Sequence, residues 1–325
     1  MVKKKDANTT KGLRRSPAVK AEGNELSKRY RQLKVSDIPI TGDYELAQWD
    51  LVVRGVLDWA GTLPDTFGTN EHPDLLDTVQ GLWDECLPER EEDLHNNSAV
   101  KKVIIDRLND WRSALGKKAV TIVSDYIKND AVLRSDSSQV ARFVGKLLPF
   151  PAGQPVSFPL IYSDPEVRII TCSFHISANI RALKALKGSW LSPVLLQVLA
   201  VHLRRVAKSP TTFGFPAGAL ALSTAAVERA LMLFKSGVNA RDEKTSHGTR
   251  AFDNNPWGGI ACRYAQSTCN LPDRKWRQVI SEASTYIAER CGASLIVEPQ
   301  TSDDIDGRSR ILVSDDEMDN QGDDF

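Results

Sequence analysis

Apolar residues recur every three or four positions along much of the chain, and this spacing predicts amphipathic α-helices. The longest such segment is 98–130, where valine, isoleucine, leucine and tryptophan follow this period. We expect one long helix there, with Ser98 as its N-cap and Gly116 as a point at which it can bend. Alternation with a period of two, which would indicate strands, is nearly absent.

The same spacing predicts further helices at about 44–63, 73–86, 193–208, 216–237 and 272–290. Four of these five segments begin with proline, which is tolerated in the first turn because its missing N–H would have no partner there. The pattern therefore predicts an all-α fold, a multi-helix bundle of about seven to nine helices.

The polar face of the long segment is rich in basic residues. They are Lys101, Lys102, Arg107, Arg112, Lys117 and Lys118, with aspartates between them. Such a face could follow the phosphates of a nucleic acid, but a solvated helix surface is the simpler interpretation.

One side of the segment 216–237 carries small residues. Ala219, Ser223, Ala226 and Ala230 are spaced by three or four positions. Small side chains let two helix backbones approach closely, so we expect this side to pack against another helix.

A proline-rich connection divides the predicted helices into two groups. Four of the 16 prolines fall in the first eleven positions of 149–173. We expect one helical domain at 41–295, or two subdomains at 41–148 and 174–295 joined by this connection.

Charge is concentrated at the two ends of the chain. Residues 1–34 hold 11 Lys and Arg against 3 Asp and Glu, a balance of +8, whereas residues 298–325 hold 2 against 10, a balance of −8. These ends cancel and the whole chain is neutral. We predict a disordered basic arm at 1–40 and a disordered acidic tail at 296–325.

Several features bear on the compartment. The sequence has no apolar run of about 18 residues and no secretory signal, and its five cysteines form an odd, scattered set. These features predict an intracellular protein, nuclear or cytoplasmic, with no membrane segment. A loose bipartite nuclear-localisation pattern, formed by Lys3, Lys4, Lys5, Arg14 and Arg15, slightly favours the nucleus.

An aliphatic triplet stands out in the acidic tail. Ile311, Leu312 and Val313 are followed by Ser314 and an acidic run. This order is typical of a SUMO-interacting segment, which adds a strand to a sheet edge while its acidic flank meets a basic rim. A chance triplet, or a short strand that folds back on the domain, is the alternative. Ser314 and Ser16 are candidate phosphorylation sites.

Catalytic and metal chemistry find little support. Cys262 and Cys269 are too widely spaced for a usual zinc pair, and His247 is the only histidine near them. His202 and Glu228 lie on two apolar segments and could form an acid–base pair, although surface residues or a satisfied core pair are simpler interpretations. We assign no catalytic, cofactor-binding or metal-binding residue and expect no cofactor.

Two glycines offer a weak anion-site signal. Gly258 and Gly259 follow an Asn-Pro-Trp sequence and precede a further helical segment, so their N–H groups could face an anion. A turn that starts a helix is the simpler interpretation.

The layout resembles an uncharacterised fungal family, domain of unknown function 6532. The resemblance covers about residues 70–290 and involves four pieces of the sequence. These are "LLDTVQGLWDEC", the following helix with Ser98, Arg112, Lys118, Val123 and Tyr126, the apolar segment from Phe174 to Val201, and "FGFPAGALALSTAAVERALMLFKSG". It implies a helical domain and brings no established activity.

Three functional hypotheses follow. The first is a non-enzymatic helical interaction domain whose charged arms recruit partners, with a protein partner bound through the acidic tail. The second is association with nucleic acid through the basic arm. The third is an enzyme whose unrecognised site would unite Glu228, His202 and Arg229.

Overall fold

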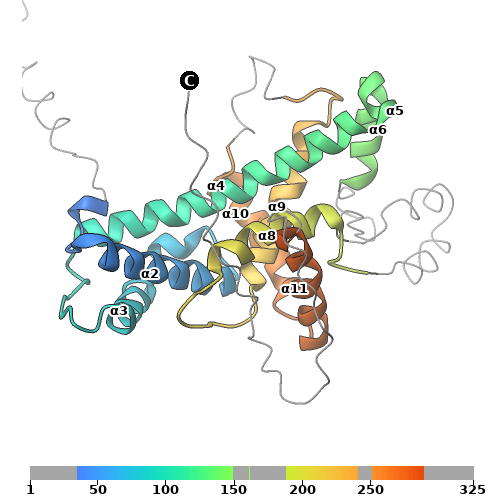
Figure 1. Cartoon of the computed structure of the whole chain (residues 1–325). Helices are drawn as coiled ribbons and strands as arrows, with labels where there is room; N and C mark the ends of the chain where they lie inside the picture. Colours follow the sequence, from blue (N-terminus) through green and yellow to red (C-terminus); the bar gives the residue numbers. More distant parts are fainter. Residues whose placement is uncertain (1–34, 149–160, 162–187, 241–250, 289–325) are drawn as a thin grey trace, which may run out of the picture.

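The computed structural model of the chain describes residues 35–148, 161, 188–240 and 251–288 (Figure 1). Within these residues the regular elements are nine α-helices and two short 3-10 helices, with no strand, which confirms the predicted all-α fold. The elements are η2 (Val35–Asp37), α2 (Gly42–Thr62), η3 (Gly68–Glu71), α3 (Leu75–Cys86), α4 (Ser98–Asn129), α5 (Ala131–Ser135), α6 (Ser137–Leu147), α8 (Pro193–Val206), α9 (Ala217–Leu233), α10 (Asn254–Thr268) and α11 (Asp273–Ala288).

Helix α4 is the longest element and crosses the whole domain (Figure 1). Its 32 residues correspond to about 48 Å at 1.5 Å per residue. The N-cap is Asn97 and not Ser98, because the Asn97 side chain accepts hydrogen bonds from the N–H groups of Ala99 and Val100, both at 3.1 Å. The helix continues through Gly116, where the absent side chain leaves room for the Phe252 ring; a Cβ there would lie 2.8 Å from a ring carbon.

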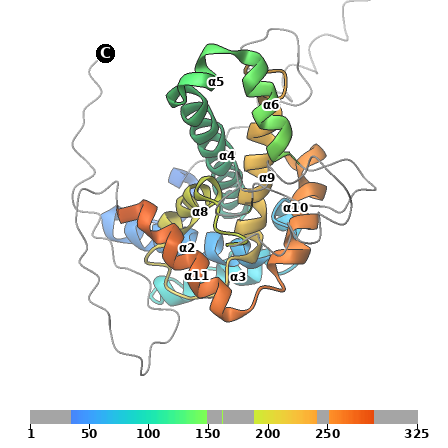
Figure 2. The same cartoon turned by 90° about the vertical axis from the view of Figure 1, so that its right-hand side faces the viewer.

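Helix α9 forms the centre of the bundle. Fifteen of its seventeen residues are buried, and it packs against α4, α10, α8 and α2. The predicted small side is fully buried, as expected, and α9 lies directly against α4 and α10. Helix α10 covers α9 on one side of the molecule, while α11 covers α8 on the other (Figure 2).

One hydrophobic core includes helices from both sides of the proline-rich connection. Trp49 of α2 and Trp83 of α3 meet edge to face with ring centroids 6.1 Å apart. Trp111 of α4 lies against His202 of α8, and Trp276 of α11 belongs to the same cluster. The helices before and after the connection are therefore held together by shared apolar burial.

Three parts of the structure differ from the sequence-based expectation. Helices α5 and α6 follow α4 directly and were not predicted; each is short and begins at an aspartate cap, Asp130 or Asp136. Gly258 and Gly259 lie inside α10, which begins at Asn254, and do not precede the helix. Residues 35–40 belong to the fold, since Ile38 is buried, so the predicted basic arm extends too far into the domain.

Candidate functional site

A shallow groove opens where α4, α8 and α11 meet. Helix α8 lies between the other two in both views of the molecule (Figures 1 and 2). The groove holds about 100 Å³. Two cationic residues and five less polar ones line it: Lys118, Arg204, Gln197, Ala200, Val201, Tyr286 and Ile287. We call this site the α4–α8–α11 groove.

The helical spacing of α8 builds one wall of the groove. Gln197, Val201 and Arg204 are four and three residues apart, so their side chains follow one another along the same face. The opposite face of α8 is buried in the core, which fixes the rotation of the helix and leaves this row partly exposed. Tyr286 and Ile287 in the last turn of α11 close the other wall.

Positive charge follows the seam between α4 and α8. Lys118 is half-buried and Arg204 is exposed. Burial lowers the pKa of the neighbouring Arg205, and the charges of Arg204 and Arg107 lower it further, whereas the Asp110 carboxylate acts in the opposite direction. Lys118 and Arg204 therefore lie beside the apolar side chains of Ala200, Val201 and Ile287 in the lining of the groove. An acidic segment with an aliphatic side chain has the complementary chemistry.

A second polar cluster lies inside the domain, around Arg112. This residue was predicted on the exposed basic face of α4, but only 4% of its surface is exposed. Its Nε donates to the Thr66 carbonyl oxygen at 2.8 Å, and the guanidinium also donates to the side chains of Thr69, Asn70 and Asn109. Arg112 thus fastens α4 to the turn that precedes α3.

Aromatic rings surround this buried cation. The Arg112 guanidinium carbon lies 5.7 Å from the centre of the Phe67 ring, and the Phe67 and Phe252 rings meet edge to face at 5.5 Å. Arg229 lies 5.7 Å from the centre of the Phe252 ring. Burial lowers the pKa of Arg112 to about 10, so its charge persists at neutral pH and is balanced by hydrogen bonds and ring faces.

The proposed acid–base residues have separate neighbours. His202 is buried against the Trp111 ring, with ring centroids 5.7 Å apart. Glu228 accepts a hydrogen bond from the Tyr264 hydroxyl at 2.8 Å. Burial raises the pKa of Glu228, although that hydrogen bond opposes the shift. The contacts of Glu228 therefore tie α9 to α10 and give no support to an acid–base pair with His202.

The cysteines differ in exposure. Cys86 is buried, Cys262 is half-buried in α10, and Cys269 is exposed at the end of that helix. Burial and the nearby Asp65 carboxylate raise the pKa of the Cys262 thiol, which disfavours the reactive thiolate. No group of three or more metal-ligating side chains occurs among the residues that the structure describes, and His247 lies outside them.

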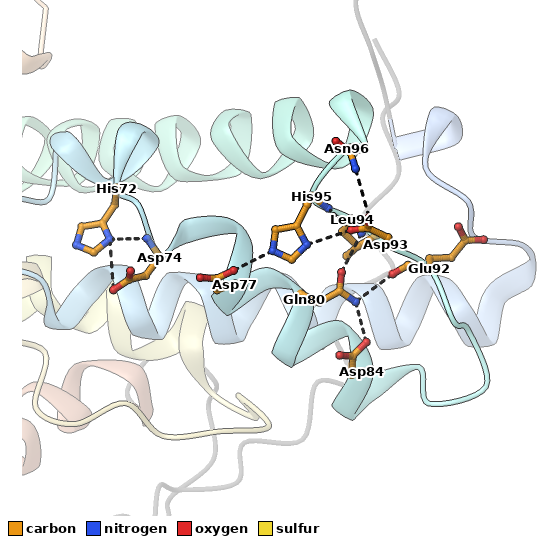
Figure 3. Close-up of polar contacts among 10 residues, drawn as sticks. All are labelled: His72, Asp74, Asp77, Gln80, Asp84, Glu92, Asp93, Leu94, His95 and Asn96. Atoms are coloured by element: carbon orange, nitrogen blue, oxygen red, sulfur yellow. Dashed lines mark hydrogen bonds and ion pairs between the residues drawn. The ribbon is translucent and has the colours of Figure 1, made fainter.

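A third polar cluster, at the surface, connects α3 to the loop before α4 (Figure 3). His95 is bonded at Nε2 to Asp77 (2.8 Å) and at Nδ1 to Asp93 (3.1 Å). Beside it, the Gln80 side-chain amide binds the loop backbone twice: it accepts from the Leu94 N–H at 2.8 Å and donates to the Glu92 carbonyl oxygen at 3.0 Å. This cluster was not predicted from the sequence, because its members come from two segments of ordinary polar composition.

This histidine makes the stability of the domain depend on pH. The hydrogen bonds to Asp77 and Asp93 raise the pKa of His95, and the bonds to His95 lower the pKa of Asp93. A raised histidine pKa stabilises the fold at low pH, and this contribution is lost as pH rises through the folded-state value. The Asp93 contribution is lost as pH falls below about 4, so the window of greatest effect is about pH 4 to 6.5.

We therefore expect His95→Gln to lower the urea midpoint more at pH 5.5 than at pH 8.5. Asp77→Asn removes the carboxylate bonded to His95 Nε2. In this variant, the His95→Gln change should lower the urea midpoint by more nearly the same amount at the two pH values. The effect is small because all three side chains are exposed to solvent. A midpoint change of equal size at both pH values would contradict this assignment.

The remaining predicted sites lie outside the described residues. They are the aliphatic triplet Ile311, Leu312 and Val313, the candidate phosphorylation sites Ser16 and Ser314, and the nuclear-localisation residues Lys3, Lys4, Lys5, Arg14 and Arg15. The structure therefore neither supports nor contradicts those predictions.

Comparison with other proteins adds no constraint. No protein-family model, curated protein or solved structure matches this chain. The resemblance to domain of unknown function 6532 accordingly stays a prediction. In the part of the chain that the structure describes, no helix is both long and apolar enough to cross a membrane. The fold and the groove define an all-α domain with a partly apolar surface depression that is lined by two cations.

Proposed function

We propose that this chain is a helical interaction domain whose α4–α8–α11 groove binds acidic segments with an aliphatic anchor residue. The observation that carries the proposal is the meeting of two kinds of groups in one depression. Lys118 and Arg204 supply positive charge, while Val201 and Ile287 supply apolar surface. Opposite charge orients a bound segment, and burial of an apolar side chain holds it.

The size of the groove limits the affinity. A cavity of roughly 150 Å³ accommodates benzene, so about 100 Å³ has room for one aliphatic side chain. Burial of such a side chain contributes about 1.5–3 kcal/mol, and each exposed ion pair adds about 0.2–1 kcal/mol. These gains are partly offset by the cost of association, so we expect a transient complex with a Kd between micromolar and millimolar.

The test is peptide binding measured by fluorescence anisotropy with the full chain. The probe is a labelled peptide with a Leu-Leu-Val core flanked by aspartates. We expect saturable binding that weakens when serines replace the aliphatic core, and that also weakens with added salt.

The groove variant is Lys118→Glu combined with Arg204→Glu, which should weaken binding roughly tenfold because two ion pairs are replaced by repulsion. Lys146→Glu is the matched control, since Lys146 is an exposed cation on α6 that does not line the groove. Equal binding by the groove variant and the control, or no binding to any form of the chain, would refute the proposed function.

The remaining functional hypotheses stay predictions. The basic arm that would bind nucleic acid lies almost wholly outside the described residues, as does the nuclear-localisation pattern. Nuclear residence and fungal origin rest on the sequence resemblance and motif alone.

A further inference from the structure

We infer that the α4–α8–α11 groove is the docking site of the chain's own residues 311–317. This inference rests on the proposed function, since it names the segment that the groove takes. The occupant would be Ile311-Leu312-Val313 with the acidic residues that follow, here called the tail segment.

The chemistry of the two partners is complementary. The tail segment has three consecutive aliphatic residues, one serine and then Asp315, Asp316 and Glu317. The groove offers room for one aliphatic side chain beside Val201 and Ile287. The acidic residues begin two positions after the triplet. When the triplet packs against Val201 and Ile287, these carboxylates come within side-chain reach of Lys118 and Arg204.

The length of the chain allows the two partners to meet. Helix α11 ends at Ala288, and its last turn contributes Tyr286 and Ile287 to the groove wall. The 22 residues 289–310 separate that helix from the tail segment. A stretch of this length spans up to roughly 75 Å, which is ample for a return to a groove that begins where the helix ends.

Attachment to the same chain compensates for the small contact area. Two binding groups joined by a linker that can span their separation meet at an effective concentration in the millimolar range. A segment with millimolar affinity therefore occupies about half of the grooves without any second molecule. An external partner of the same chemistry must displace the tail segment. The tail therefore raises the concentration of partner that is needed to fill the groove.

Carbodiimide cross-linking of the full chain tests the contact directly. The reagent activates a carboxyl group, and a nearby lysine Nζ displaces it to form an amide bond. We expect mass spectrometry to find Lys118 joined to Asp315, Asp316 or Glu317 in the monomer fraction. Lys117 is the internal control because it is exposed on the same helix and does not line the groove.

The decisive variant replaces Ile311, Leu312 and Val313 together by serine and keeps every carboxyl group. It should lower the yield of the Lys118 cross-link at least about tenfold, because docking would lose its apolar anchor. Equal cross-linking at Lys117 and Lys118, or an unchanged yield in the serine variant, would overturn the inference. Cross-links found only between isotopically light and heavy chains in a mixture would also overturn it, since they would place the contact between molecules.

The anisotropy assay separates this inference from the proposed function. Tighter binding of the probe peptide to the serine variant than to the wild type supports both. Equal probe binding by the two chains, with no Lys118 cross-link, overturns tail docking and leaves the proposed function standing. A Lys118 cross-link that depends on the triplet, with no probe binding to either chain, supports tail docking and overturns binding in trans.

Discussion

Gly218→Ala is expected to destabilise the domain by about 3 kcal/mol or more. Gly218 lies in the first turn of α9, where the helix passes the end of α2. A Cβ at this position would lie 1.9 Å from the Leu63 carbonyl oxygen and 2.9 Å from the carbon of that carbonyl. These are backbone atoms that cannot rotate away, so relief requires one helix to move, and overpacking of this kind reaches or exceeds the usual 1–3 kcal/mol.

Gly259→Ala is the matched control for this prediction. Gly259 is exposed inside α10, and a Cβ there would meet nothing within 4 Å. The same chemical change should stabilise the domain by about 0.5–1 kcal/mol, because alanine loses less backbone freedom than glycine when a helix forms. Urea unfolding followed by far-ultraviolet circular dichroism measures both changes. Midpoints that shift in the same direction for the two variants would contradict the close contact at Gly218.

Arg112→Met is expected to cost about 2–4 kcal/mol of folding free energy. Methionine preserves much of the apolar stem and removes the donors. The Thr66 carbonyl and the Thr69 hydroxyl are buried and would lose the hydrogen bonds they receive from the guanidinium, although the carbonyl keeps one from the Thr69 hydroxyl at 3.2 Å. A buried group that loses its partner costs about 1–3 kcal/mol. Part of this loss is offset because a charge no longer has to be buried.

Two further variants serve as comparisons for Arg112→Met. Arg112→Lys keeps the charge but cannot reproduce the forked geometry, so it should also destabilise the fold. Lys117→Met, an exposed change on the same helix, should stay within about 0.5 kcal/mol. Thermal unfolding of the three variants side by side checks the order. An Arg112→Met protein as stable as Lys117→Met would show that the buried cluster does not hold α4 to the turn before α3.

Long helices were predictable because their periodic signal accumulates over many residues. The short helices α5 and α6 were not, since five and eleven residues give little periodicity and their clearest signals are single aspartate caps. At α10 the sequence Asn-Pro-Trp-Gly-Gly favours a turn, and Asn255 does keep a non-helical backbone (φ −111°, ψ 107°). The glycines that follow are helical, because the buried Trp257 and the packing of α10 against α9 favour the helix there.

The groove could not be predicted, because its residues are brought together only by folding. Lys118, Arg204 and Tyr286 come from three helices that are far apart in the sequence, and none of them belongs to a known catalytic or binding motif. The burial of Arg112, in contrast, had a signal. It is four residues after Leu108 and three before Leu115, so it occupies a core-facing position of the helix. The prediction placed Arg112 on the exposed face because it considered only the charge of the residue and not its position in the helix.

Helix α4 carries both Arg112 and Lys118, and this joint placement limits how its length can vary. A residue inserted or deleted between these two positions would rotate one relative to the other by about 100°. Either the guanidinium would leave the turn before α3 or the lysine would leave the groove. Changes in length are tolerated more readily in the loop before α4 than in the six-residue step from Arg112 to Lys118. The register of this single helix thus couples the position of Lys118 in the groove to the packing of Arg112 in the core.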